Sequence, residues 1–265
     1  MKIGNSTPFK ATQGPENPKP EDFSPALGIE TGMLNRALRA MELLSADSSI
    51  TEEEFQNYKF DISYSNDSAI AKSWKTLCDA PKSDDPLVNE ALDVARRWDL
   101  RTNVENPATA ISLLTIGPGS DDEVASHDLT SLLALLKSNA EALKQSHGRI
   151  DVPWGDVNRL KRGTVNLPTA GGPDVLHAVY GSRVSHGKLE GLENGQLHGR
   201  AGDCLIILVT WDKNGKVHSK SIHQYGSATS RPDSKHYADQ APLFVACKLK
   251  PVWMDESEIR AHLER

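Results

Sequence analysis

Hydrophobic residues recur every three or four positions through the first half of the chain, a spacing that places them on one face of an α-helix. The segment "TEEEFQNYKF" opens with Thr51 and Glu54, the pair that forms a helix capping box. In "TGMLNRALRAMELL" the spacing puts five apolar residues on one stripe: Met33, Ala37, Ala40, Met41 and Leu44. Further helices are predicted in "DSAIAKSWKTLC", "DPLVNEALDVARRW", "PATAISLLTI" and "SHDLTSLLALLKSNAEALKQ".

The pattern changes after residue 148, where glycine and proline become frequent and the apolar runs become shorter. "DCLIILVTW" has the composition of a buried strand, "DKNGK" contains an Asn-Gly turn, and "VHSKSIHQYG" alternates. Together they predict an antiparallel hairpin from Cys204 to Gln224. We expect Ile206 and Leu208 to face the helices of residues 31–146. The segments "DQAPLFVACKLK" and "DESEIRAHLER" are predicted to return to helix.

The first 30 residues are rich in proline and predict extended, irregular chain, because proline disfavours helix at itself and at the residue before it. The sequence therefore predicts one α+β domain with three regions. Residues 1–30 form an extended segment, residues 31–148 a helical region, and residues 149–265 a sheet-rich region with C-terminal helices.

Composition narrows the classes of function. The 265 residues are 38% hydrophobic and 25% charged, as in an ordinary globular protein. The formal net charge of -6 argues against a nucleic-acid partner, because no basic surface is expected. No apolar run reaches the roughly 20 residues of a membrane span. The N-terminus lacks the apolar region of a signal peptide, so a stand-alone product is expected in the cytoplasm.

Residue spacing alone reveals no catalytic or metal-binding motif. The three cysteines lie far apart, and "GTVNLPTAGGPDV" lacks a phosphate-binding pattern, so we interpret it as a turn. His218 and His223 would point to opposite faces of one strand, which disfavours a shared metal. No metal site is expected among the histidines of the second half, which are His177, His186, His198, His218, His223 and His236.

Several longer blocks resemble the C-terminal half of the β subunit in the penicillin acylase family. They are "NSTPFKATQGPENPKPEDF", "LGIETGMLNRALRAMELL", "RWDLRTNVENPA", "PWGDVNRLKRG", "GGPDVLHAVYG", "QYGSATSRPDSKHYADQ" and "KLKPVWMDESEIRAH", and they follow the order of the family. The subgroup resembled most contains acyl-homoserine lactone acylases and related aculeacin-type lipopeptide or penicillin V acylases. The resemblance implies part of an αββα N-terminal nucleophile hydrolase fold, incomplete at its N-terminus.

The resemblance also implies two site residues. Asn5, followed by Ser6, Thr7 and Pro8, matches the asparagine whose side-chain N–H stabilises the oxyanion formed during amide cleavage. The alternative is that Asn5 only begins a turn. Arg36 matches an arginine that orients the site, with Arg39 as its rival and a solvated surface position as the ordinary alternative.

The block "KHYADQ" recurs in the family, and we expect it to have a structural role. His236, Asp239 and Gln240 are predicted to form a buried polar network that holds the C-terminal helix on the sheet. We also expect Pro8 and Phe9 to anchor the opening loop, so that Asn5 is held at the edge of the sheet beside the position of the nucleophile.

In the family, an N-terminal serine attacks an N-acyl amide, such as an acyl-homoserine lactone, penicillin or lipopeptide, and its own α-amino group acts as base. No residue here matches that serine, so the chain alone is expected to be inactive. Its expected partners are the N-terminal part of the β subunit, an α subunit and an N-acyl substrate. The alternative is an inactive remnant or binding module. No cofactor is expected, although calcium occurs in some relatives. The family analogy implies a periplasmic or secreted enzyme.

Overall fold

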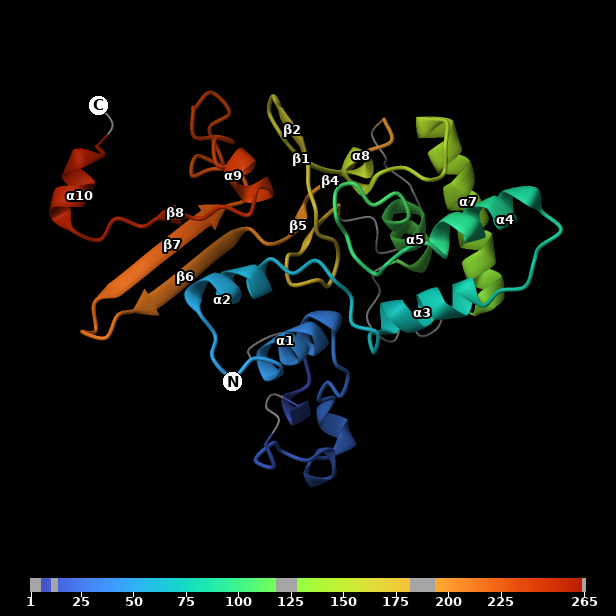
Figure 1. The fold of residues 1–265 in the computed structure, drawn as a ribbon, viewed down its shortest axis with the longest axis horizontal. Helices are drawn as coiled ribbons and strands as arrows, with labels where there is room; N and C mark the ends of the chain where they lie inside the picture. Colours follow the sequence, from blue (N-terminus) through green and yellow to red (C-terminus); the bar gives the residue numbers. More distant parts are fainter. Residues whose placement is uncertain (1–5, 11–13, 118–127, 182–193, 264–265) are drawn as a thin grey trace.

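The structure, a computed structural model, describes the chain except for residues 1–5, 11–13, 118–127, 182–193 and 264–265 (Figure 1). Short 3-10 helices precede the first α-helix: η1 (Pro8–Lys10), η2 (Pro20–Asp22) and η3 (Pro25–Leu27). The α-helices of the first half are α1 (Asn35–Ser45), α2 (Glu52–Lys59), α3 (Ala69–Cys78), α4 (Pro86–Ala95), α5 (Thr109–Ile116) and α7 (Leu129–His147). Those of the second half are α8 (Trp154–Val157), α9 (Ala241–Val245) and α10 (Glu256–Ala261).

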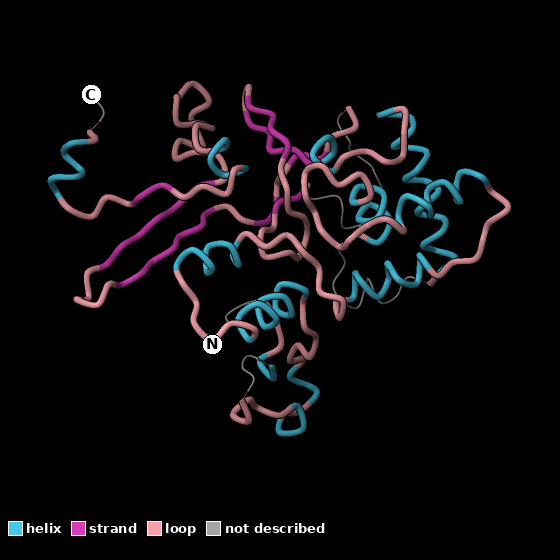
Figure 2. Tube along the Cα trace, viewed as in Figure 1, coloured by secondary structure: helices cyan, strands magenta, loops and turns pink. Residues whose placement is uncertain are grey.

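The strands lie in the second half, in sheets of two or three strands among the described residues (Figure 2). They are β1 (Asn158–Arg162), β2 (Val165–Pro168), β3 (Val179–Tyr180), β4 (Leu197–His198), β5 (Ala201–Gly202), β6 (Leu205–Trp211), β7 (Val217–His223) and β8 (Lys250–Pro251). β1 lies between an antiparallel β2 and a parallel β4. β3 pairs with β5, and β7 lies between β6 and β8.

The predicted α+β class is confirmed, with a helical first half and sheets in the second. Local signals also formed as expected. The Thr51 hydroxyl accepts a hydrogen bond from the Glu54 N–H at 3.2 Å, and the Glu54 carboxylate accepts one from the Thr51 N–H at 2.9 Å. The predicted helices at the two C-terminal segments are present as α9 and α10. The division into three regions of one domain stays a prediction.

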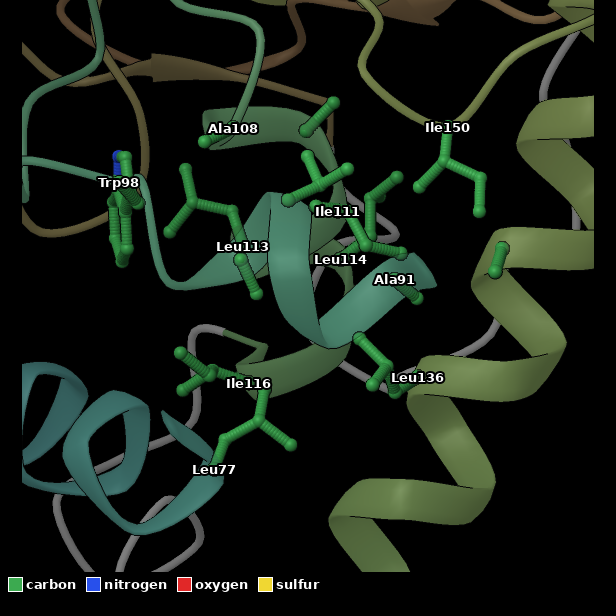
Figure 3. Close-up of a cluster of buried hydrophobic side chains, with 14 of the residues drawn as sticks. Leu77, Ala91, Trp98, Ala108, Ile111, Leu113, Leu114, Ile116, Leu136 and Ile150 are labelled. Atoms are coloured by element: carbon green, nitrogen blue, oxygen red, sulfur yellow. The ribbon is translucent and has the colours of Figure 1, made fainter. Parts of the chain in front are cut away.

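The largest hydrophobic cluster surrounds α5, and Figure 3 shows side chains from several helices converging on it. Every residue of α5 is buried. A helix that is enclosed in this way has an apolar surface on all sides rather than on one stripe. Several of its polar groups have hydrogen-bond partners, although the buried Ser112 hydroxyl has none among the described residues. The Thr109 hydroxyl donates to the Arg101 carbonyl at 2.8 Å, and the Asn139 amide donates to the Leu114 carbonyl at 2.9 Å.

The apolar stripe of α1 is much less buried than its spacing suggests. Only Ala37 of the five stripe residues is buried, and Leu44 is 37% exposed. In Figure 1, α1 lies at the margin of the fold beside the N-terminal segment rather than inside the helical cluster. Its position therefore depends strongly on polar contacts, which are described below.

The predicted hairpin is confirmed as antiparallel, with Trp211 opposite Val217 beside the turn. Ile206 and Leu208 are buried as expected, while the alternate residues of β6 are exposed. The expected packing partner was right only for α2, whose Glu52 binds Thr210 and Lys220 of the hairpin, because the hairpin belongs to a second cluster built mainly from the second half of the chain. Its buried members are Leu160, Val179, Ile206, Ile222, Tyr225, Ala241 and Phe244. Phe60, at the end of α2, is the first-half residue that packs against this cluster.

Two adjacent isoleucines of β6 provide a test of this arrangement. We expect Ile206→Ala to lower the free energy of unfolding by about 2–5 kcal/mol, because Ile206 is 5% exposed and its removal leaves a cavity. Ile207 is 56% exposed, so Ile207→Ala should cost less than about 1 kcal/mol. Urea denaturation of both variants measures the difference, and equal losses would contradict the observed strand orientation.

Candidate active site

Asn5 lies outside the described residues, so its predicted contact is not described. Thr7 lies two residues after Asn5 and is among the described residues. Its backbone N–H donates to the Gly32 carbonyl at 3.1 Å, which ties the described start of the chain to the segment leading into α1. Phe9 packs against Phe23, with ring centroids 5.8 Å apart. Phe9 is therefore anchored within the N-terminal segment, and the position of Asn5 at the edge of the sheet stays a prediction.

Helix α1 begins on a carboxylate from a distant part of the chain. Leu34 is its N-cap and offers no side-chain hydrogen bond. Instead, the Asp174 carboxylate accepts the backbone N–H of Asn35 at 2.7 Å and that of Arg36 at 3.5 Å. Free N–H groups and the helix dipole both favour a negative charge at this end of a helix. Asp174 thus supplies the cap that the local sequence lacks.

The buried Asn35 side chain links the same helix to two other segments. It is 1% exposed, and its amide nitrogen donates to the carbonyls of Ser63 at 3.2 Å and Asp174 at 2.8 Å. Its amide oxygen accepts the Ser65 backbone N–H at 2.8 Å. Both ends of the amide are therefore satisfied, as burial of a polar group requires.

The loop that carries Asp174 has a constrained backbone. Asp174 has a φ of 54°, in the left-handed region that few non-glycine residues adopt. The Tyr64 hydroxyl donates to the adjacent Pro173 carbonyl at 2.6 Å. Gly171 has a φ of 90°, and a Cβ at this position would lie 2.3 Å from the His177 carbonyl oxygen. The loop is thus packed closely enough to hold the Asp174 carboxylate against α1.

Burial raises the pKa of Asp174 above its ordinary value, because an ionised carboxylate loses hydration there. The Arg36 side chain and the backbone N–H groups of Asn35 and Arg36 oppose the rise. Arg36 contributes through its Nε atom, which lies 3.0 Å from Asp174 Oδ1. The charge state of Asp174 is therefore coupled to Arg36.

The two candidate arginines differ in how fully their nitrogens are used. Arg39 donates to both carboxylate oxygens of Asp61, at 3.1 and 3.0 Å, and to Glu42 at 2.6 Å. Burial acts to lower the pKa of Arg39, but Asp61 and Glu42 outweigh it and leave the pKa raised. Arg36 is 41% exposed, and within the described residues its side chain donates only through Nε. Within the described residues, Arg36 therefore keeps both terminal nitrogens for a ligand, whereas each nitrogen of Arg39 already donates one hydrogen bond.

The "KHYADQ" block forms polar contacts, but the network is not buried. Nδ1 of His236 lies 2.7 Å from Asp239 Oδ2, and the side chains are 34% and 38% exposed. Gln240 makes the predicted link between α9 and the sheet. Its side-chain oxygen accepts the His223 N–H at 3.0 Å, and its backbone N–H donates to the Tyr225 carbonyl at 2.7 Å. The expectation of burial was wrong for His236 and Asp239.

The remaining histidines and acids do not assemble a metal centre among the described residues, where no group of three or more potential ligands is suitably placed. His177 is buried between Phe60 and Phe244, with Nδ1 3.4 Å from Asp203. His186 lies outside the described residues. Within the described part of the chain, no helix is long and apolar enough to cross a membrane.

The sequence patterns did not indicate Asp174 or Asn35 as residues of the candidate site. "GTVNLPTAGGPDV" was interpreted as a turn, although its residues Val165–Pro168 form β2 and its glycine pair leads directly to Asp174. The sequence does contain a local signal for Asp174. Two glycines followed by Pro-Asp favour an unusual backbone conformation, which can point a carboxylate toward another segment. Nothing in the sequence indicated which helix the carboxylate would meet.

The class of protein follows from comparison with known families. The sequence profile of the penicillin amidase family matches residues 117–261, more than half of the chain. The chain therefore belongs to the penicillin amidase family, as the sequence blocks implied.

Individual relatives are matched over only part of their own length. The acyl-homoserine lactone acylase PvdQ of Pseudomonas fluorescens is 28% identical over 134 residues, which are 49% of this chain and 15% of that protein. A thermostable penicillin G acylase from Alcaligenes faecalis superposes with a TM-score of 0.45 at 14% identity. That superposition covers 97% of this chain and 55% of the acylase chain. The chain thus spans only part of the length of these relatives.

The coupling between Asp174 and Arg36 can be tested by titration. We expect the Asp174 carboxyl, followed by carbon-detected NMR, to titrate above the ordinary aspartate range. Arg36→Ala should raise this pKa further, because it removes a cation that opposes the effect of burial. Arg97→Ala, at an exposed position in the turn that follows α4, is the control and should leave the pKa of Asp174 unchanged.

The sign of the stability effect follows from the raised pKa. Asp174 binds its proton more tightly in the folded state than in the unfolded state. The stability gained from this tighter binding is fully present below the unfolded pKa near 3.8. It is lost as pH rises through the higher folded pKa. A titration midpoint below the ordinary range, or no response to Arg36→Ala, would contradict the coupling.

Proposed function

We propose that this chain works in a hydrolase that cleaves the amide bond of N-acyl substrates through an N-terminal serine nucleophile. The match of residues 117–261 to the penicillin amidase family carries the proposal. The similarity to an acyl-homoserine lactone acylase supports an acylated amine as substrate class. The acyl chain and the amine could be those of an acyl-homoserine lactone, a penicillin or a lipopeptide.

The proposed reaction converts an amide and water into a carboxylic acid and an amine. The serine hydroxyl attacks the amide carbonyl, and the α-amino group of the same serine takes the hydroxyl proton and passes it to the departing amine. Water then cleaves the acyl-serine ester and releases the acid. An α-amino group suits this work because its ordinary pKa is about 7.7–8.0.

In this proposal, Asn5 donates its side-chain N–H to the oxyanion that forms on attack. Such a donor stabilises the transition state by about 3 kcal/mol, because it is oriented before the charge develops. The contact between Thr7 and Gly32 supports the proposal, since it ties a residue near Asn5 in sequence to the segment that leads into Arg36.

Arg36 is proposed as a positioning residue for Asn5 and the nucleophile. Two observations support this choice over Arg39. Asp174 holds the Nε side of Arg36 at the start of α1, and the partly exposed guanidinium keeps further donors. Each nitrogen of Arg39 already donates a hydrogen bond to Asp61 or Glu42.

The proposed partners are the part of the β subunit that carries the serine, together with an α subunit. The match covers 15% of the acyl-homoserine lactone acylase, which is consistent with such further parts. By analogy with the family, we propose that the assembled enzyme works in the periplasm or outside the cell.

Complementation tests the role of Asn5. The portion of a β subunit that begins at the nucleophilic serine, with an α subunit, is supplied in trans or by fusion. We expect release of free acid from a panel of N-acyl substrates. Asn5→Ala should lower kcat by about 10²- to 10³-fold with little change in KM, because the contact is made mainly in the transition state.

Asn57→Ala, at an exposed position on α2, is the matched control and should leave kcat unchanged. A kcat within about twofold of wild type for Asn5→Ala would refute the oxyanion assignment. If the wild-type chain assembles with its partners by size-exclusion chromatography but releases no acid, the chain is an inactive remnant or a binding module.

The two arginines should separate activity from stability. Arg36→Ala should lower kcat of the assembled enzyme by about 10- to 100-fold through misplacement of the site. It should change the free energy of unfolding by less than about 1 kcal/mol, because its ion pair is partly exposed. Arg39→Ala should instead cost about 1–3 kcal/mol, since it leaves the Asp61 carboxylate, which is 14% exposed, without its ion-pair partner.

Arg36→Lys provides a further check, because it keeps the charge but loses the planar donors and should recover only part of kcat. Urea denaturation and initial-rate kinetics on the same preparations distinguish the two roles. An Arg36→Ala enzyme with unchanged kcat would remove Arg36 from the site.

A further inference from the structure

A cavity of about 620 Å³ lies among the strands of the second half, away from the cluster at α1. Its walls come from the end of β1, the residues that follow β4, the start of the β6 segment and the residues that follow β7. Neither Arg36 nor Asp174 lines it. It is therefore a separate site with its own chemistry.

The wall of this cavity is strongly cationic. Lys161, Arg162 and Arg200 line it, together with the imidazoles of His198 and His223. Among the described residues, no aspartate or glutamate belongs to the lining. Like charges in one partly enclosed space repel each other, and an anion placed between them removes that repulsion.

Arg162 is held in a fixed orientation by aromatic rings. Its guanidinium carbon lies 4.0 Å from the ring centroid of Tyr225 and 5.2 Å from that of Tyr237. The Tyr225 hydroxyl donates to the Gly199 carbonyl at 2.7 Å, which fixes the ring in turn. A stacked guanidinium keeps the edge that carries its N–H donors available for an oxyanion.

Two buried donors at the cavity have no hydrogen-bond partner within the described part of the chain. They are Nη1 of Arg162 and Nε2 of Gln224. Gln224 is 8% exposed and lines the cavity. Buried donors in proteins are nearly always paired, so two unpaired donors at one cavity indicate a missing acceptor.

Arg200 lies close to the same aromatic ring. Burial raises the pKa of Tyr225, and the positive charges of Arg162 and Arg200 act against that rise. Both arginines line the same cavity, so both can contact one small ligand there. Within the described residues, neither of them forms an ion pair.

We propose that this cavity binds a small oxyanion of charge -2 or more, such as a phosphate group or a small dicarboxylate, through Arg162, Arg200 and the Gln224 amide. Two arginine cations in a described lining that contains no aspartate or glutamate favour a dianion over a monoanion. An acceptor-only group also matches the two unpaired donors. The proposal does not depend on the proposed amide hydrolysis.

Binding to the 265-residue chain is measured by isothermal titration calorimetry at constant ionic strength. The probes are inorganic phosphate, succinate and acetate. We expect saturable binding at one site, at least tenfold tighter for phosphate or succinate than for acetate. The tighter of the two dianions assigns the ligand to the phosphate or the dicarboxylate class.

Variants locate the binding. Arg200→Gln and Gln224→Leu should each weaken binding of the tighter dianion, the first by at least tenfold. Lys213→Gln removes one positive charge from the turn of the β6–β7 hairpin, which is at the opposite end of these strands from the cavity. This control should change the affinity by less than twofold.

Arg162→Lys keeps the charge but loses the planar donor edge, so it should also weaken binding while circular dichroism confirms the fold. Non-saturable heats, equal affinity for acetate, or an Arg200→Gln affinity within twofold of wild type would overturn the proposal. An equal loss in Lys213→Gln would do the same, because it would mean that only overall charge matters.

Discussion

The contact between the Asp174 carboxylate and the first N–H groups of α1 joins residues 139 positions apart. Helix α1 has no side-chain cap of its own and buries little of its apolar stripe, so neither local capping nor packing fully accounts for its position. A carboxylate at a helix N-terminus contributes roughly 0.3–1 kcal/mol, and up to about 2 kcal/mol when partly buried. Here the same group also accepts a hydrogen bond from Arg36, so the candidate site and the helix share one support.

Two hydrophobic clusters frame this polar junction. The larger one surrounds α5, and the smaller one joins the hairpin to α9 and to Phe60. Asn35 and Asp174 connect α1 to the segment at Ser63 and Ser65, next to Tyr64 of the larger cluster. Apolar burial is strong but not directional, whereas these hydrogen bonds specify orientation. Orientation is what a positioning arginine requires.

The two proposed sites lie in different parts of the molecule. The amidase proposal rests on the family match and on Asn5 and Arg36. The oxyanion proposal rests on Arg162, Arg200 and Gln224, which meet at a cavity among the second-half strands. One site would stabilise a charge that exists only during reaction, and the other would bind a stable anion. In both proposed sites the arginine must be oriented before the anion is bound or formed. Asp174 orients Arg36 in the first site, and Tyr225 orients Arg162 in the second.

Local features of the fold could be predicted from the sequence, because periodicity, capping residues and turn residues act over a few positions. These features include the helices of the first half, the capping box of Thr51 and Glu54, and the hairpin with its buried Ile206. The resemblance of whole blocks likewise indicated the family. The partner of the hairpin, the exposure of His236 and the choice of Asp174 to begin α1 were decided only by the tertiary structure. Each depends on groups far apart in the chain, and a pattern of neighbouring residues does not determine which distant segments meet.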